Sequence, residues 1–284
     1  MPELPEVETT LLGIKPHILH QTIVDVTIRQ HQLRWLIPQD TASRLKGQNI
    51  LSIARRGKYI MIATTTGTIL IHLGMSGRLS IVPLTTAPAK HDHIDIQLGQ
   101  QQLLRYTDPR RFGAFLWIDT QPVLQHPLLS KLGLEPFDPN FHGDYLWHKA
   151  QNKSVAIKAF IMNQHIVVGV GNIYATEALF MTGIHPSTPA KLISNEQMHN
   201  LARAIKTILN YAIQAGGTSL KDFLQADGKP GYFKLQLQIY DRNGLPCPKC
   251  QTTIEKLIIG QRTSTFCPIC QILPRRSYGK EHVC

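Results

Sequence analysis

The sequence predicts an α+β fold with two domains, a β-sandwich preceded by one helix and a helical domain that ends in a cysteine-rich β-hairpin. Three observations support this prediction. Apolar residues alternate with polar ones in several short runs between residues 20 and 120, which is typical of the strands of a sandwich or barrel. Apolar residues recur at helical spacing after residue 142. Four cysteines late in the chain form two C-x-x-C pairs.

The first domain is predicted to span residues 1–120. It begins with a helix over residues 3–18, where apolar residues recur at helical spacing and Pro5 is tolerated in the first turn. Turns at Thr66-Gly67 and Gly99-Gln100 are predicted to join neighbouring strands into hairpins. The predicted strands cover residues 23–28, 50–64, 68–73, 93–98, 103–106 and 113–118.

The second half of the chain is predicted to be mainly helical. Residues 121–142 are rich in proline and polar residues and are expected to form the linker. A helical domain over residues 143–235 follows, with a glycine-rich turn at residues 168–172. Ser194 is a suitable N-cap for the longest helix. The predicted helices cover residues 154–162, 173–181 and 194–214.

Length and composition limit the class of protein. The 284 residues, of which 43% are hydrophobic, are enough for two buried cores and exclude a disordered chain. No apolar run approaches the roughly 20 residues of a membrane-spanning helix. The acidic, proline-interrupted start does not resemble a secretory signal. We therefore expect a cytoplasmic protein that does not enter a membrane and whose thiols are reduced.

The charge balance indicates a polyanionic partner. Thirty Lys and Arg against 19 Asp and Glu give a net charge of +11. Nucleic acid is the favoured partner. A membrane surface is less favoured because no basic amphipathic helix is evident, and a charge that only aids solubility is the third alternative. The basic side chains cluster at Arg55, Arg56 and Lys58, at Arg105, Arg110 and Arg111, and in the last 45 residues.

The four cysteines have the spacing of a metal site. Cys247 and Cys250 form one C-x-x-C pair, and Cys267 and Cys270 form a second one 16 residues later. Such pairs supply the four thiolates of a tetrahedral zinc shell. Redox-active or free thiols are the alternative. We predict one structural Zn²⁺ that folds the finger, with a hairpin between the pairs that carries Arg262 near its tip.

The N-terminus has residues suited to amine chemistry. Pro2 is small enough to permit removal of Met1, which would expose a secondary amine. Glu3 and Glu6 lie three residues apart and therefore on one helix face. A helix N-terminus disfavours a protonated amine and favours carboxylates. The pattern suits an amine nucleophile with acid–base helpers, although a capped helix with solvated acids gives the same spacing.

Several motifs together resemble bacterial formamidopyrimidine-DNA glycosylases. The run MPELPEVET at residues 1–9 is similar to the start of this family. The related endonuclease VIII group usually begins Pro-Glu-Gly-Pro-Glu, so Leu4 favours the formamidopyrimidine branch. Further similar motifs are HLGMSG at 72–77, KHDH at 90–93, RYTDPRRFG at 105–113, VGVGNIYA at 168–175, GGTSLKDF at 216–223 and the four cysteines.

This resemblance implies base-excision repair of double-stranded DNA by a bifunctional glycosylase and abasic-site lyase. The implied lesions are oxidised purines, namely 8-oxoguanine and formamidopyrimidines. Pro2 is implied to be the nucleophile that forms a Schiff base with the sugar, followed by β- and δ-elimination. Glu3 is implied to be the acid–base residue that helps to open the sugar ring, and Glu6 to orient the amine and the sugar. Lys58 is implied to contact the phosphates at the lesion.

The resemblance also implies a set of DNA contacts. Met75, Arg110 and Phe112 match a wedge that fills the gap left by the extruded nucleotide, whereas core packing is the alternative for Met75 and Phe112. Lys158 matches a lysine near the lesion. The implied phosphate contacts are His91, Arg111, Asn172, Tyr240 and Arg262.

The same resemblance refines the expected architecture. It implies a helix–two-turn–helix within residues 143–235 and a zinc finger over residues 236–271. Residues 218–232 match a mobile loop that closes over the flipped base. The chain continues past Cys270 further than the family pattern, and we expect residues 272–284 to be a flexible tail in which Cys284 has no role.

Two other functions are compatible with parts of the sequence. A non-enzymatic zinc-finger protein that binds damaged or single-stranded DNA would share the charge and the cysteines, but would not need Pro2, Glu3 and Glu6 together. An enzyme that prefers oxidised pyrimidines would share all of these features. We expect a monomer that associates with the bacterial nucleoid through DNA.

Overall fold

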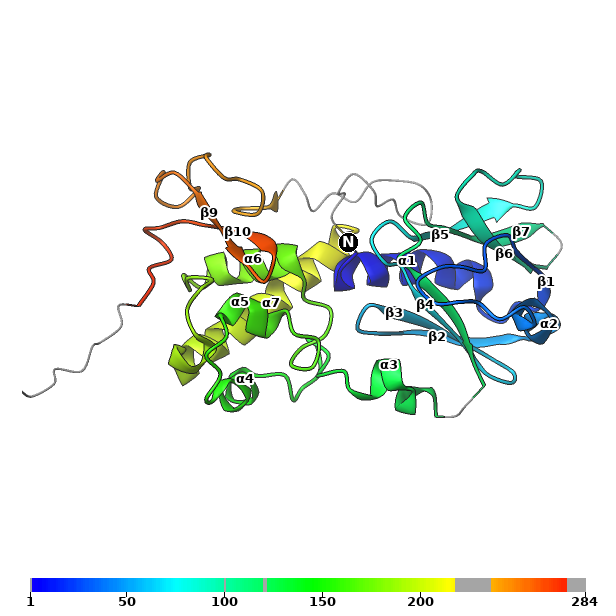
Figure 1. Ribbon diagram of the computed structural model, residues 1–284, viewed down its shortest axis with the longest axis horizontal. Coiled ribbons are helices and arrows are strands. Elements are labelled where there is room, and N and C mark those ends of the chain that lie inside the picture. Colours follow the sequence, from blue (N-terminus) through cyan, green and yellow to red (C-terminus); the bar gives the residue numbers. More distant parts are fainter. Residues whose placement is uncertain (1, 100, 120–121, 218–235, 275–284) are drawn as a thin grey trace, which may run out of the picture.

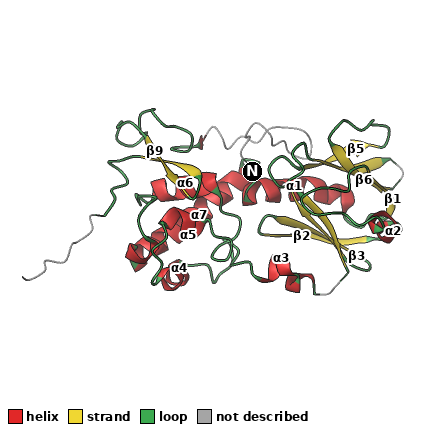
Figure 2. Cartoon of the chain, in the orientation of Figure 1, coloured by secondary structure: helices red, strands yellow, loops and turns green. Residues whose placement is uncertain are grey.

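The computed structural model of the chain describes residues 2–99, 101–119, 122–217 and 236–274. Two halves lie side by side, one built mainly of strands and the other mainly of helices (Figures 1 and 2). The N-terminal helix lies between them (Figure 1). None of the helices in the described part of the chain combines the length and apolar character that crossing a membrane requires.

The N-terminal helix α1 (Leu4–Ile18) connects the two halves. Glu3 and Glu6 form a capping box at its start, which satisfies backbone N–H groups that have no partner within the helix. Its apolar face, which includes Val7 and Ile14, is buried. The predicted helix is therefore confirmed, and its first turn is fixed by the same carboxylates that the sequence identifies as candidates for catalysis.

Eight strands of the described N-terminal half form a sandwich of two antiparallel four-stranded sheets, as predicted. The sheets have the orders β1-β6-β7-β5 and β2-β3-β4-β8, and a short helix α2 (Thr41–Leu45) packs on β1. Their strands are β1 (Ile23–Ile28), β2 (Ile50–Arg56), β3 (Tyr59–Thr64), β4 (Thr68–His72), β5 (Arg78–Pro83), β6 (Asp92–Leu98), β7 (Gln102–Thr107) and β8 (Ala114–Ile118).

The strand prediction was wrong at two places. Residues 50–64 are not one strand, because the chain turns at Gly57 and Lys58 between β2 and β3. Gly57 has a φ of 58°, a conformation that glycine adopts without steric cost. The turn places Lys58 at the end of a hairpin. Strand β5 was not predicted, although it completes its sheet beside β7.

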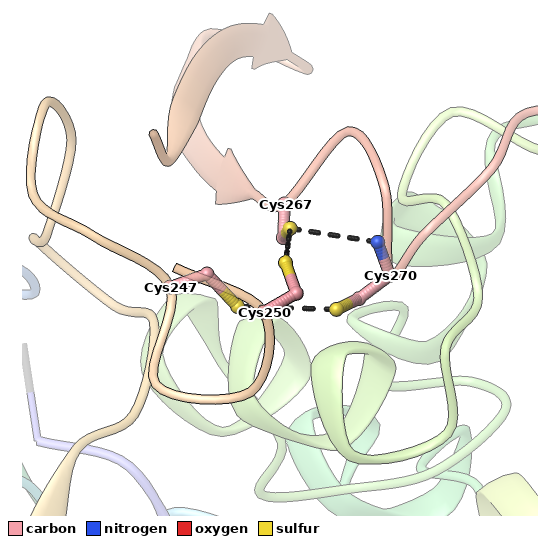
Figure 3. Close-up of side chains that lie close together, drawn as sticks. All are labelled: Cys247, Cys250, Cys267 and Cys270. Carbon is pink, nitrogen blue, oxygen red and sulfur yellow. Dashed lines mark hydrogen bonds between the residues drawn. The ribbon is translucent and has the colours of Figure 1, made fainter. Parts of the chain in front are cut away.

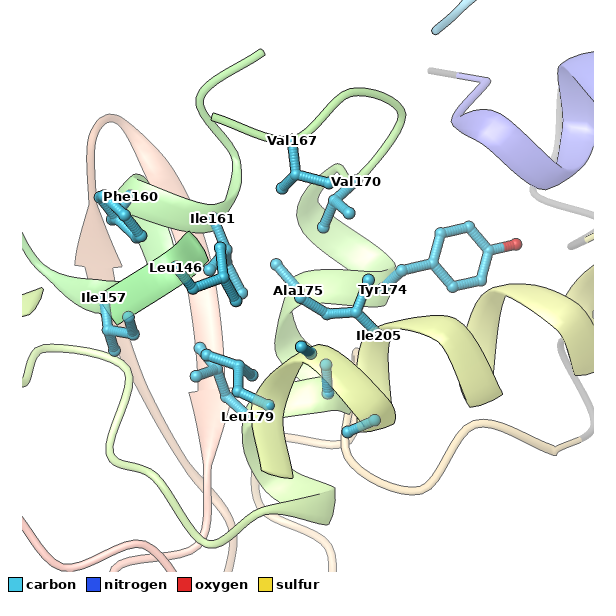
Figure 4. Packing of buried hydrophobic residues seen from close by; sticks show 14 of the residues in the cluster. Leu146, Ile157, Phe160, Ile161, Val167, Val170, Tyr174, Ala175, Leu179 and Ile205 are labelled. Carbon is cyan, nitrogen blue, oxygen red and sulfur yellow. The ribbon is translucent and has the colours of Figure 1, made fainter. Parts of the chain in front are cut away.

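The helical half packs around the pair α6 and α7. Helix α7 begins at the predicted Ser194 cap, whose Oγ accepts a hydrogen bond from the Gln197 N–H. Helix α5 is shorter than predicted. Figure 4 shows Tyr174 at the edge of this core, with its ring directed towards α1. The elements are η1 (Val123–Gln125), α3 (Pro127–Ser130), α4 (Gly143–Ala150), α5 (Ile157–Ile161), α6 (Asn172–Met181), η2 (Ala190–Leu192) and α7 (Asn195–Gln214).

The C-terminal finger is a small unit packed on the helical half. Strands β9 (Glu255–Ile259) and β10 (Arg262–Phe266) form the predicted hairpin, with Arg262 next to its tip. Its small core brings Ile254 and two cysteines against Phe180 of α6. The loop expected at residues 218–232 and residues 275–284 of the expected tail lie outside the described residues.

Candidate active site

Glu3 is held by the amino end of α6. Its carboxylate accepts hydrogen bonds from the Gly171 N–H (2.7 Å) and the Ile173 N–H (2.9 Å). A Cβ on Gly171 would lie 2.3 Å from the Glu3 carboxyl carbon, so only glycine allows this approach. The side chain is 3% exposed, and burial raises the pKa of Glu3 despite these amides and Lys58. A carboxyl group that retains its proton more readily suits a general acid.

Glu6 links the start of α1 to Tyr174. One carboxylate oxygen accepts the Glu3 N–H at 2.9 Å, and the other accepts the Tyr174 hydroxyl at 2.6 Å. Glu6 is also buried. Pro2, which is buried itself, therefore precedes two carboxylates that contacts with α6 hold in place. The sequence predicted that Glu3 and Glu6 share a face, and the structure adds the α6 groups that fix them.

A cavity of about 240 Å³ opens where the two halves and the finger meet. Lys58 and Arg34 line it from the sandwich, residues 168–171 from the helical half, and Arg262 from the finger. Burial lowers the pKa of Lys58, opposed by Glu3 and Glu6, while Arg262 lowers it further. Three cations around one opening create a favourable site for an anion such as a phosphodiester.

Among the cavity residues that sequence reasoning missed are Arg34, Tyr59 and His72. The rings of Tyr59 and His72 lie 4.9 Å apart. Burial and the nearby cations Lys58 and Arg34 lower the pKa of His72 to about 4, so its ring is neutral at pH 7. Its Nδ1 accepts the Gly74 N–H, which leaves the proton on Nε2. His72 begins the HLGMSG motif, which was a usable signal, whereas Arg34 lies in no motif.

Asn172, Tyr240 and Arg262 come together at one side of the cavity. The Asn172 amide donates to the Thr263 carbonyl at 3.2 Å. Burial raises the pKa of Tyr240, against a hydrogen bond with Asn172 that lowers it. Glu177, which the sequence did not single out, accepts the backbone N–H groups of residues 238–240. Three predicted phosphate contacts therefore share one edge, and a buried carboxylate holds part of that edge.

Lys158 lies beneath this edge. Its side chain is 1% exposed, and its ammonium donates to the Ser264 hydroxyl (2.7 Å) and the Thr263 carbonyl (3.3 Å). Burial lowers its pKa to about 8. In this structure Lys158 joins α5 to the finger hairpin that carries Arg262.

Two exposed apolar side chains stand beside the cavity on neighbouring loops. Met75 is 37% and Phe112 54% exposed, so the core-packing alternative is wrong for both. The Arg110 guanidinium lies 3.8 Å from the Met75 sulfur. A second hollow of about 240 Å³ contains Met75 and Phe112 together with Arg34 and His72. Because Arg34 and His72 line both hollows, these loops adjoin the candidate active site.

The predicted basic clusters are only partly free for a polyanion. Arg55 pairs with Glu8 and Glu135, and Arg56 pairs with Glu135. We call these four residues the clamp, because Glu135 follows α3 and binds the β2–β3 hairpin. Arg105 is buried and pairs with Asp95. The prediction of a phosphate track was therefore wrong for three arginines. In contrast, Arg110 and Arg111 are exposed and His91 is partly exposed.

The four cysteines converge in the finger (Figure 3). All four sulfur atoms lie within 4.8 Å of one another. The Cys247–Cys270 and Cys250–Cys267 sulfur distances are 3.9 and 3.4 Å. A tetrahedral shell with Zn–S bonds of about 2.3 Å separates its sulfurs by about 3.8 Å, so the donor set fits one structural zinc ion. Lys249, inside the first pair, donates to the carbonyls of Phe180 and Met181 at the end of α6.

Comparison with known families covers most of the chain. The N-terminal domain of formamidopyrimidine-DNA glycosylase matches residues 1–115, and its H2TH domain matches residues 132–224. A zinc finger found in FPG and IleRS matches residues 244–272. A formamidopyrimidine-DNA glycosylase of Photobacterium damsela subsp. piscicida is 54% identical over 272 residues, which are 95% of this chain and 100% of the relative.

Solved structures are similar over nearly the same length. A Lactococcus lactis FPG mutant in complex with DNA containing Fapy-dG has a TM-score of 0.88 and 32% identity, and covers 95% of this chain and 100% of its own. The wild-type Lactococcus lactis FPG (MutM) with DNA containing an oxidised pyrimidine has a TM-score of 0.87 and 32% identity, with the same coverage.

Proposed function

The chain belongs to the family of formamidopyrimidine-DNA glycosylases, and from this premise we propose how its residues act. It is a DNA-repair enzyme that removes oxidised purines from DNA, with the abasic-site lyase activity consistent with its family. The observation that carries the assignment of roles is the burial of Glu3 and Glu6 between Pro2 and the amino end of α6. These contacts hold both carboxylates next to the candidate nucleophile.

Pro2 acts as the nucleophile once Met1 has been removed. Its nitrogen bonds to the sugar C1′, and the bond from C1′ to the base breaks with its electron pair leaving on the base, which takes up a proton. Glu3 donates a proton to the ring oxygen as the sugar opens, which leaves an iminium between Pro2 and C1′. The iminium acidifies the C2′ hydrogen, so loss of that proton to a base breaks the C3′–O bond and releases the 3′-phosphate. Loss of the C4′ proton then breaks the C5′–O bond and releases the 5′-phosphate. Glu6 orients the amine.

The cations around the cavity hold the DNA backbone at the lesion. Lys58 and Arg262 line the cavity, and we assign them the phosphates on either side of the everted nucleotide. Asn172, Tyr240, His91 and Arg111 extend this phosphate contact, and Lys158 supports Arg262 from below. Met75, Arg110 and Phe112 occupy the space that the nucleotide leaves in the duplex.

The arrangement of the wedge and the cavity also indicates which form of DNA the protein binds and in what oligomeric state it acts. A wedge has a role only in a stacked helix, so the substrate is double-stranded DNA. The described residues of a single chain supply the catalytic groups, the wedge and the finger together, so the protein acts as a monomer on DNA in the bacterial nucleoid. Oxidised pyrimidines are a second substrate class, because a similar enzyme has been solved with DNA that contains one.

Borohydride trapping tests the proposal. The protein, with removal of Met1 verified by mass spectrometry, is mixed with a duplex that contains 8-oxoguanine in the presence of borohydride. We expect a covalent protein–DNA adduct that maps to Pro2, and strand cleavage without borohydride. A binding protein without catalysis gives neither product. Cleavage by the processed protein without any adduct would overturn the role of Pro2. The same assay with a thymine-glycol duplex compares the cleavage rates of oxidised pyrimidines and oxidised purines.

A further inference from the structure

Three loops to which we assign DNA contacts converge on one buried residue, Asp108. Met75 lies on the loop over residues 74–77, and Phe112 on the loop over residues 109–113. His91 lies in the turn before β6. Asp108, at the end of β7, touches all three segments and is 0% exposed. No described Lys or Arg side chain forms an ion pair with it, so hydrogen bonds alone hold this carboxylate.

The Asp108 side chain connects the Met75 loop to the Phe112 loop. One oxygen accepts the Ser76 hydroxyl at 2.7 Å. The other accepts the Gly113 N–H at 2.8 Å and the Tyr106 hydroxyl at 3.2 Å. Ser76 completes the link, because its Oγ in turn accepts the Arg110 N–H at 3.1 Å. The spacing between Met75 and Phe112 is therefore set through a few buried hydrogen bonds.

The Asp108 backbone binds the third segment, the turn that carries His91. Its N–H donates to the His91 carbonyl at 3.1 Å, and its carbonyl accepts the Arg111 N–H at 3.2 Å. The His93 ring lies 2.8 Å from the same carbonyl. Segments that carry Met75, His91, Arg111 and Phe112 are thus joined around one residue that does not reach the surface.

We propose that Asp108, acting through Ser76, is the positioning residue that keeps the Met75 and Phe112 loops in the one spacing that displaces a nucleotide from the duplex. This inference rests on the glycosylase activity proposed above. A wedge must enter the base stack as a rigid body, because unstacking costs a few kcal/mol and a loop that yields would not perform it. Asp108 is too deeply buried to touch DNA, so it acts only through the loops.

A double-mutant cycle tests this role. Asp108→Asn, Met75→Ala and the double variant are compared by single-turnover excision of 8-oxoguanine from a duplex. An asparagine has an amide N–H₂ donor in place of one of the two acceptor oxygens. Loss of a buried hydrogen bond of this kind is expected to slow excision about tenfold. If Asp108 acts through Met75, the double variant is no more than about twofold slower than the slower single variant.

Two further variants complete the test. Ser76→Ala removes the hydroxyl that links Asp108 to Arg110. It replaces Asp108→Asn in the cycle if Asp108→Asn has a lowered zinc content or melting temperature, and the same coupling with Met75→Ala is expected. Tyr106→Phe, which removes the longest hydrogen bond to Asp108 and leaves both loops attached, is the control and is expected to stay within about twofold of wild type. Losses that multiply in the double variant would overturn the inference. An inactive wild type would instead contradict the proposed function.

Discussion

Neighbouring basic residues have contrasting roles at the clamp and at the cavity. Arg55 and Arg56 belong to the clamp, where Glu8 and Glu135 neutralise them. Lys58, two residues further on, lines the cavity beside Arg34 and Arg262. The net charge of +11 therefore does not measure how many cations meet DNA. An arginine with an acidic partner inside the chain holds structure together, and a cation without one attracts a phosphate.

The difference between the cavity and the clamp predicts its largest effect on excision rate for a matched pair of Glu→Gln substitutions, one at each place. Glu3→Gln at the cavity is expected to slow single-turnover excision of 8-oxoguanine about 100- to 10,000-fold, the range of general acid–base catalysis, because an amide cannot transfer the proton. Glu8→Gln in the clamp removes the same charge and is expected to stay within about threefold. Equal losses in the two variants would show that Glu3 acts only in folding.

Removal of zinc is expected to have the next largest effect. The finger carries Arg262 to the cavity, and Lys249 attaches the first cysteine pair to the end of α6. Because a structural zinc ion supplies much of the folding free energy of such a unit, chelation is expected to weaken DNA binding more than about tenfold and to be reversed by added Zn²⁺. Titration of a fluorescent duplex measures this. Unchanged affinity at a verified zero zinc content would refute it.

A smaller effect, on DNA affinity and its salt dependence, is expected to distinguish Arg262 from Arg56. Arg262→Ala is expected to weaken binding several-fold on any DNA sequence, and to reduce the slope of log K against log salt by about one phosphate contact. Arg56→Ala in the clamp is expected to leave that slope unchanged and to lower the melting temperature, because Glu135 loses a partner. Binding isotherms at four salt concentrations, with melting curves, check both. A reduced slope for Arg56→Ala would place the clamp in the DNA interface.

Local patterns were enough to predict much of the fold. Alternating residues predicted the sandwich, and the Ser194 cap marked the start of α7. The spacing of Glu3 and Glu6 placed them on one face, and the cysteine spacing predicted the metal centre. Each of these features depends on residues close in sequence or on a motif of fixed spacing, which is why it could be recognised in a single chain.

Contacts between distant residues could not be predicted in this way. Glu3 meets Gly171 across 168 positions, and Glu135 lies 80 positions from Arg55. Nothing in the basic runs distinguishes Arg55 from Lys58, because the acids that neutralise one of them come from elsewhere in the fold. The turn at Gly57 was missed for a different reason. Strand-forming residues at 50–53 and 59–62 made the whole stretch resemble one strand and concealed a single glycine between basic residues.

Lys158 differs both from the clamp arginines and from the cations of the cavity. It is a buried cation whose hydrogen-bond partners are a hydroxyl and a carbonyl. Burial lowers its pKa to about 8, against about 10.4 for an unperturbed lysine. Between these values the unfolded chain binds more protons than the folded chain, so this group makes the free energy of unfolding rise with pH by at most about 1.4 kcal/mol per unit. Lys158→Met is expected to abolish that rise.

Urea unfolding curves between pH 7 and pH 10.5 measure the difference between wild type and Lys158→Met. Because the wild-type lysine loses its destabilising charge as the pH increases, the difference is expected to shift in favour of wild type above pH 8 and to be constant below it. Lys153→Met, at an exposed lysine of the same half, is the control and is expected to keep the wild-type slope. Parallel curves for wild type and Lys158→Met would mean that Lys158 keeps its proton throughout and would contradict the lowered pKa.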